Sequence, residues 1–225
     1  MPARRRPLLG FNPKTRALRW IGQPLVVLAT LIPLGIAVYG LAAGRIFDPV
    51  EALTDITGTS ALVILLVSLA VSPLRRLTAW HWLVRFRRTL GLAAFGYALA
   101  HLSVYLLLDQ GLAWRFIVED ITERPYITVG FTAFLILLPL ALTSTNGMMR
   151  RLGRNWTRLH RLSYLAAALG VLHFLWLVKA DLREPLIYAS VLTALLGFRV
   201  VDQRLQRRRA RKRPGTQPSP EFANS

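Results

Sequence analysis

The charged residues of this 225-residue chain are gathered into short clusters that leave six long apolar windows between them. Counted strictly between charged residues, these windows are residues 20–44, 56–74, 89–108, 125–149, 162–178 and 185–198. The first five contain 17 to 25 residues, enough for a helix to cross a bilayer core of about 30 Å. The sixth contains 14, but Arg199 can snorkel and extend it to about Val201. The pattern predicts six transmembrane helices.

Local signals refine the ends of these helices. The first is expected over about 20–41 with a bend at Pro24 or Pro33, and the second over about 58–71, after an outer loop at 45–57 and before Ser72-Pro73. The others are expected over about 89–108, 126–143, 155–179 and 185–201, with an outer loop at 109–125 and Gly147 as a helix C-cap.

The charges are distributed unequally between the two sides of this bundle. The side with both termini and the 75–88 and 150–161 loops has 24 Lys/Arg and two acids, whereas the other has five bases and nine acids. The positive-inside rule therefore predicts that both termini are cytoplasmic. The net charge of +18 then reflects a basic face against anionic lipid headgroups rather than nucleic-acid binding.

The domain organisation follows from the same pattern. Residues 1–19 form a basic cytoplasmic lead, and residues 20–202 form an all-α, six-helix transmembrane domain. Residues 203–225 form a basic, then Pro/Ser-rich, cytoplasmic tail that is expected to be disordered. No internal repeat and no second domain are visible.

The sequence excludes several kinds of chemistry. It has no cysteine, so disulfides, iron–sulfur clusters, thiolate-bound zinc and covalent c-type haem are ruled out. It has no G-x-G-x-x-G fingerprint, no P-loop and no H-E-x-x-H pair. A redox centre would have to be held by histidine, and its electrons would come from a separate protein or from membrane quinol.

Two histidines are predicted to lie at the same depth. His101 follows Arg88 by thirteen residues and His173 follows Arg161 by twelve, on two helices that run in the same direction. Two neutral imidazoles facing each other across a bundle can be the axial ligands of a b-type haem. The alternative is that each is a buried histidine bonded to a backbone carbonyl.

His160 is a different case, because no histidine on the third helix matches its depth; Arg87 and Arg88 stand there instead. On a continuous helix His160 and His173 would be about 20 Å apart and about 140° apart around the axis. His160 would either hold an inner haem alone or with an unusual partner, or bond a haem propionate, a flavin or a quinone. His81, between two tryptophans, is interpreted as a headgroup-level residue rather than a ligand.

Several segments resemble the MsrQ (YedZ) family, the haem-binding membrane subunit of a bacterial periplasmic methionine sulfoxide reductase system within the ferric-reductase-like transmembrane group. The resemblance covers about residues 45–190. It is carried by the segments DPVEALTDITG, VRFRRTLGLAAFGYALAHLSVY, ITERPYITVGF, LALTSTNGMMRRLGRNWTRLHRLSYLAAALGVLHFLWLVK and REPLIYA.

The resemblance implies a multi-pass protein of the bacterial inner membrane with one or two b-type haems and a flavin mononucleotide (FMN). It would be a non-catalytic electron-transfer subunit, passing electrons from a cytosolic flavin reductase or quinol to a periplasmic molybdopterin-containing reductase that repairs oxidised methionine. The family's histidine positions correspond to His101, His160 and His173, and an arginine of its inner site corresponds to Arg87.

The inner surface also offers phosphate partners. Arg150, Arg151 and Arg154 are candidates to pair with the flavin phosphate, although arginines there are also expected from topology alone. Compared with the larger ferric reductases and NADPH oxidases, this chain lacks a second histidine on the third helix and a soluble flavin/nicotinamide domain. Two alternatives remain: a quinol-oxidising cytochrome b for another periplasmic acceptor, and a transporter that uses the histidines for protons or metal.

Overall fold

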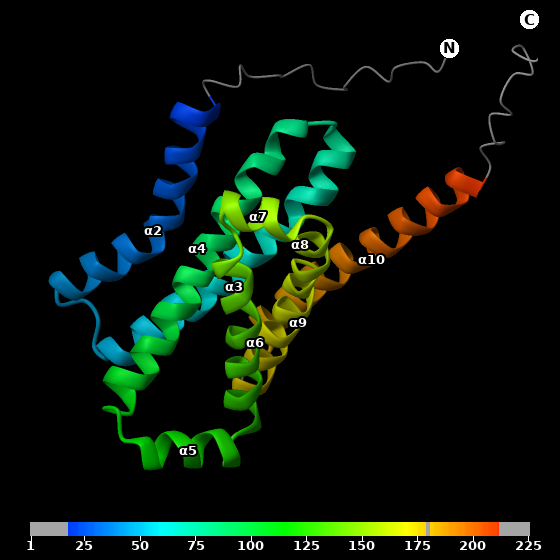
Figure 1. Ribbon diagram of the computed structural model, residues 1–225. Coiled ribbons are helices and arrows are strands. Elements are labelled where there is room, and N and C mark those ends of the chain that lie inside the picture. The colour runs from blue at the N-terminus through cyan, green and yellow to red at the C-terminus, as the bar shows by residue number, and fades with distance from the viewer. Residues whose placement is uncertain (1–17, 179–180, 212–225) are drawn as a thin grey trace, which may run out of the picture.

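The computed structural model describes residues 18–178 and 181–211, and every regular element in that part of the chain is a helix (Figure 1). The predicted all-α class is therefore confirmed. Most of the basic lead, residues 179–180 and the last part of the tail lie outside the described residues. The elements, in order, are η1 (Leu18–Gly22), α2 (Gln23–Ala42), α3 (Pro49–Thr78), η2 (His81–Leu83), α4 (Val84–Ser103), η3 (Val104–Asp109), α5 (Trp114–Glu123), α6 (Pro125–Leu142), α7 (Asn146–Leu152), α8 (Arg154–Leu159), α9 (Leu162–Leu177) and α10 (Arg183–Arg211).

Five helical segments in the described part of the chain are long and apolar enough to span a membrane. They are Trp20–Ala42, Pro49–Thr78, His81–Asp109, Pro125–Leu142 and Arg183–Gln206. The remaining apolar helix, α9, has 16 residues, or about 24 Å at 1.5 Å per residue, which is shorter than a bilayer core of about 30 Å. The described helices thus give five candidate spans rather than six.

The predicted fifth helix over 155–179 is wrong as a single element. The chain turns at His160 and Arg161, so that α8 ends before His160 and α9 begins after Arg161. The angular separation of about 140° between His160 and His173 assumed a continuous helix, so it does not apply.

The predicted outer loop at 45–57 is also wrong beyond Asp48. The Asp48 carboxylate accepts hydrogen bonds from the backbone N–H groups of Val50 (2.9 Å) and Glu51 (3.0 Å), and Pro49 follows it at the first helical position. Aspartate before proline is a strong helix start. α3 then continues through Pro73 to Thr78 instead of ending at the predicted Ser72-Pro73 boundary.

Three further boundaries differ from the prediction. The outer loop at 109–125 contains the short helix α5. Gly147 is not a C-cap but lies inside α7, whose N-cap is Thr145 with its hydroxyl oxygen accepting from Met148 N–H at 3.2 Å. α10 continues to Arg211, beyond the predicted end of the sixth helix at about Val201.

The bundle is built from two closely packed helix pairs, α3 with α4 and α6 with α9. α2 lies against α3 and α4, while α10 lies against α9 and α3. The shared core includes Leu69, Ala94 and Ala166, each with no more than 1% of its surface exposed. α2 contains Pro33 and is bent (Figure 1), and the Tyr97 hydroxyl on α4 donates to the Thr30 carbonyl of α2 at 2.6 Å.

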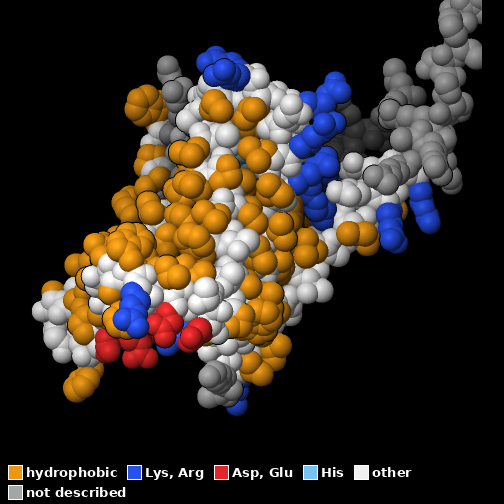
Figure 2. Space-filling view, turned by 60° about the horizontal axis from the view of Figure 1, so that its bottom comes forward, with side chains coloured by type: hydrophobic (Ala, Val, Ile, Leu, Met, Phe, Trp, Pro, Cys, Tyr) orange, Lys and Arg blue, Asp and Glu red, His pale blue; other side chains and the backbone are white. Residues whose placement is uncertain are grey.

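The molecular surface separates apolar, acidic and basic regions. Hydrophobic side chains cover the flanks in Figure 2, and among them Leu25, Leu28 and Ile36 on α2 are each 63% exposed. Such a broad apolar surface requires lipid around it. The acidic end is defined by Asp48, Glu51, Asp55, Asp109, Glu119, Asp120, Glu123, Asp181 and Glu184; the basic end is defined by Arg75, Arg76, Arg87, Arg88, Arg150, Arg151, Arg154, Arg158, Arg161 and Arg204.

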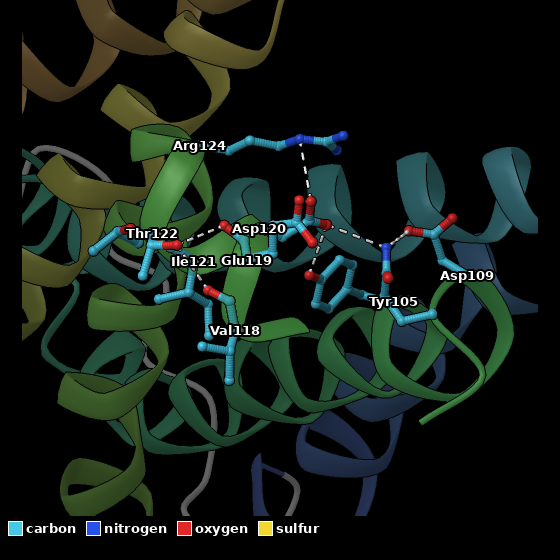
Figure 3. A network of polar contacts seen from close by, with 10 residues as sticks. Tyr105, Asp109, Val118, Glu119, Asp120, Ile121, Thr122 and Arg124 are labelled. Atoms are coloured by element: carbon cyan, nitrogen blue, oxygen red, sulfur yellow. Dashed lines mark hydrogen bonds and ion pairs between the residues drawn. The ribbon is translucent and has the colours of Figure 1, made fainter. Parts of the chain in front are cut away.

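At the acidic end, Asp120 fixes α5 to η3 and to Gln110, the residue that follows η3 (Figure 3). Its carboxylate accepts from the Tyr105 hydroxyl at 3.0 Å and from the Gln110 amide at 3.2 Å. It also pairs with Arg124 Nε at 3.2 Å. Asp120 is only 9% exposed, so these partners satisfy a carboxylate that would otherwise be costly to bury.

Asp120→Ala is expected to loosen this end of the molecule. The Tyr105 hydroxyl would lose its acceptor, at a cost of about 1–3 kcal/mol for a group left unsatisfied, and the Gln110 amide would keep Asp109 as an acceptor. We expect the apparent thermal midpoint in detergent to fall by roughly 2 °C or more. Glu119→Ala, at an exposed neighbour on α5, is the matched control, and equal midpoints for the two variants would contradict the assignment.

Candidate functional site

His101 on α4 and His173 on α9 face each other inside the bundle. Their ring centroids are 6.2 Å apart and the ring planes are nearly perpendicular, at 79°. The two helices run in the same direction from the basic to the acidic end, so the equal depth predicted from the arginine spacing is confirmed. The structure brings together two of the three predicted histidine ligands.

Each ring is oriented by a backbone carbonyl from a neighbouring helix. His101 Nδ1 lies 3.0 Å from the Thr54 carbonyl of α3, and His173 Nδ1 lies 2.6 Å from the Tyr126 carbonyl of α6. A carbonyl oxygen can only accept, so Nδ1 must carry the hydrogen in both rings. In the neutral imidazole the lone pair is then on Nε2, the atom available to a metal ion.

This arrangement fits a metal ion held between two imidazoles. Metal–nitrogen bonds of about 2 Å on both sides place the two ring centroids roughly 6 Å apart, close to the 6.2 Å separation of His101 and His173. Metal-bound histidines usually donate the other ring N–H to a carbonyl or carboxylate. No group of three His, Cys, Asp or Glu residues that could hold a metal ion is present within 18–178 and 181–211.

A cavity of about 800 Å³ opens at the acidic end beside this pair. Its wall includes Thr54, whose carbonyl orients His101, and Phe174, the residue after His173. Six carboxylates also line it: Asp48, Glu51, Asp55, Asp109, Asp181 and Glu184. Neither histidine lines this negatively charged cavity; the pair is linked to it through Thr54 and Phe174.

His160 lies in a separate environment toward the basic end. Its ring stacks on Trp156, with centroids 3.9 Å apart and an interplanar angle of 26°. His160 Nδ1 is 3.1 Å from the Trp156 carbonyl, and Nε2 is 3.3 Å from the Ser144 hydroxyl oxygen. The Arg87 guanidinium is close enough to act on His160 electrostatically.

The arginines predicted as site residues are divided between two surroundings. Arg87 Nη1 donates to the Ser72 hydroxyl at 3.1 Å, which holds it inside the bundle near His160. Arg150, Arg151 and Arg154 lie exposed on α7 and at the start of α8, and the structure does not bring them into the histidine pair. His81 is exposed in η2, in agreement with its interpretation as a surface residue.

Sequence reasoning missed the partners that orient these histidines. Thr54 and Tyr126 act through backbone carbonyls, which give no side-chain signal. Ser144 and Trp156 come from the stretch interpreted as a loop and helix start, and Trp156 also donates its indole N–H to the Thr143 carbonyl at 3.0 Å. The one available signal was the polar Ser-Thr run at the end of an apolar helix.

The helices and the facing histidines define a polytopic, all-helical membrane protein with a candidate metal site between two helices. Residues 56–171 match the family described as ferric reductase like transmembrane component. Two similar proteins are named protein-methionine-sulfoxide reductase heme-binding subunit MsrQ. The one from Xanthomonas campestris pv. campestris (strain 8004) is 56% identical over 171 residues, 76% of this chain and 78% of that protein. The one from Azospira oryzae is 50% identical over 196 residues, 86% and 84% of the two chains.

The chain therefore belongs to the MsrQ family within the ferric-reductase-like transmembrane group. The resemblance stated from the sequence is confirmed.

Proposed function

We propose that this protein is the haem-binding membrane subunit of a protein-methionine-sulfoxide reductase system and that it carries electrons across the inner membrane. The observation that carries the proposal is the pair of imidazoles His101 and His173, 6.2 Å apart, with both Nδ1 atoms committed to carbonyls. The family names of its relatives agree with this chemistry.

A b-type haem bound at this pair would supply reversible one-electron chemistry. The protein's own contribution is binding and tuning. His101 and His173 would hold the haem iron through Nε2, and the Thr54 and Tyr126 carbonyls would make the imidazoles more basic through their hydrogen bonds. Both side chains are half-buried in the bundle, and the two carbonyl hydrogen bonds keep each ring in one orientation.

The charge distribution supports the proposed orientation. The basic end would be cytoplasmic and the acidic end periplasmic, with α8 and α9 together providing the sixth crossing. Electrons would leave at the acidic end, where the carboxylate-lined cavity adjoins the histidine pair. A molybdopterin-containing reductase subunit would receive them there, and the chain itself would remain a non-catalytic electron-transfer subunit.

The inner cofactor would be bound near His160. His160 stacks on Trp156, and the Arg87 guanidinium acts on it electrostatically. Arg150, Arg151 and Arg154 would supply phosphate partners if that cofactor is FMN. The stacked rings of Phe95 and Phe134, with centroids 5.7 Å apart, join α4 to α6 between the two ends. The donor would be a cytosolic flavin reductase or quinol.

A reoxidation experiment tests this proposal. The purified protein is reduced with dithionite, excess reductant is removed, and the haem absorption bands are followed after mixing with a molybdopterin methionine sulfoxide reductase subunit. We expect rapid reoxidation only when both that subunit and methionine sulfoxide are present. Haem bands without such reoxidation would favour a quinol-oxidising cytochrome b for another acceptor. A protein with no haem bands would favour the transporter.

A further inference from the structure

The two histidines occupy equivalent positions in two similar parts of the chain. His101 Nδ1 bonds a carbonyl 47 residues earlier, and His173 Nδ1 also bonds a carbonyl 47 residues earlier. Each partner helix has a glycine four residues after that carbonyl, Gly58 on α3 and Gly130 on α6. The same offset of 72 positions separates the two histidines, the two carbonyl residues and the two glycines.

The packing repeats with the same offset. Each unit consists of a helix that runs from the acidic to the basic end and a second helix that runs back. The first unit contains α3 and α4, and the second contains α6 and α9. These are the two most closely packed helix pairs. Leu65 and Leu137 are buried at 6% and 8% exposure, and Ala94 and Ala166 at 0% and 1%. The units 54–101 and 126–173 are thus two copies of one helix–connection–helix arrangement, although no repeat is visible in the sequence.

The glycines explain how each imidazole reaches its carbonyl. In a helix the carbonyl of one residue accepts the N–H four residues later, and the side chain at that later position is tilted back over the same turn. A Cβ on Gly130 would lie 2.7 Å from His173 Nδ1 and 2.9 Å from Cε1. A Cβ on Gly58 would lie 3.0 Å from His101 Nδ1 and Cε1. A Cβ at Gly130 would therefore force the imidazole to shift from its carbonyl, and a Cβ at Gly58 would require the imidazole to give by a few tenths of an ångström.

We infer that Gly58 and Gly130 are equivalent positioning residues: they hold His101 and His173 in the Nδ1–H form, with Nε2 directed to a site shared by the two units. This inference rests on the proposed haem function and extends it to residues that do not touch the metal. The acidic end of the bundle has a matched pair of histidines, one from each unit. The basic end has no such pair, because the residue 72 positions before His160 is Arg88.

The test compares four glycine variants, each purified and assayed by pyridine haemochrome per polypeptide, midpoint potential and low-spin ferric EPR. Gly130→Ala is expected to lose at least half of the haem. Gly58→Ala, with the milder contact, is expected to retain more haem but to show a more positive potential, because a weakened Nδ1–H hydrogen bond lowers the basicity of the imidazole. Gly170→Ala on α9 and Gly96→Ala on α4 are the controls, since a Cβ there meets Leu62 at an ordinary 3.4 Å or nothing within 4 Å.

Alanine is intrinsically preferred over glycine inside a helix, so losses confined to positions 58 and 130 would identify the imidazole contact as their cause. If Gly130→Ala does not accumulate in the membrane, the potential and EPR spectrum of Gly58→Ala decide. Haem content, potential and EPR spectra equal to those of the controls would overturn the inference. Retention of full haem by His101→Ala and His173→Ala in the same series would instead overturn the haem assignment itself.

Discussion

His101→Ala and His173→Ala are each expected to abolish the low-spin haem spectrum and to lower the haem content of that site at least tenfold. Loss of a residue that only supports a metal ligand typically costs roughly 10–100-fold in metal affinity, and removal of the ligand itself should cost no less. The measurement is the pyridine haemochrome assay on purified protein, together with EPR of the ferric state.

The two variants should behave alike because their environments are alike: each ring bonds a carbonyl from a neighbouring helix, and the two rings face each other with centroids 6.2 Å apart. His81→Ala is the matched control, since His81 is an exposed histidine and its loss should leave the spectrum unchanged. A full low-spin spectrum in either His101→Ala or His173→Ala would show that the pair is not the axial ligand set.

The depth of these two histidines could be predicted from the sequence because charge sets the membrane boundary. Arg88 and Arg161 mark the basic end of two helices that run in the same direction. A rise of 1.5 Å per residue then gives nearly equal depth for residues twelve or thirteen positions later. The apolar windows between charged residues likewise identified the five long helices, because burial of charge in lipid is costly.

Helix ends were harder to predict, because the same residue types can start one helix and end another. Asp48-Pro49 was interpreted as a turn, but a carboxylate that caps two backbone N–H groups makes it a helix start. Pro73 was interpreted as a terminator, yet it lies inside α3. Neighbouring helices and local adjustments tolerate proline in membrane helices, and this depends on packing that the local sequence does not contain.

The repeat of 72 residues was invisible for a related reason. It depends on glycines and carbonyls, Gly58 with Thr54 and Gly130 with Tyr126, so one partner in each pair has no side chain and the other acts through its backbone. The equivalence becomes apparent only when both histidines are found bonding carbonyls at the same chain separation. Pattern analysis of side-chain types has no access to such contacts.

His160→Ala is expected to remove a second cofactor at the basic end while leaving the low-spin haem held by His101 and His173 intact. The Trp156 carbonyl can only accept, so His160 Nδ1 carries the hydrogen and Nε2 has the lone pair. The nearby Ser144 hydroxyl has one hydrogen, which it donates to the Leu140 carbonyl at 2.7 Å. His160 Nε2 is therefore left with a lone pair that a cofactor can use.

The measurement is haem and acid-released flavin per polypeptide in wild type and in His160→Ala, with Ser144→Ala as a control that removes only the neighbouring hydroxyl. Two haems falling to one would identify a second haem, held by His160 opposite Arg87 rather than by a histidine pair. One haem retained with flavin lost would assign the basic end to FMN and make Arg87 and the exposed arginines of α7 and α8 its phosphate partners. Haem and flavin both unchanged in His160→Ala would contradict a cofactor at this position.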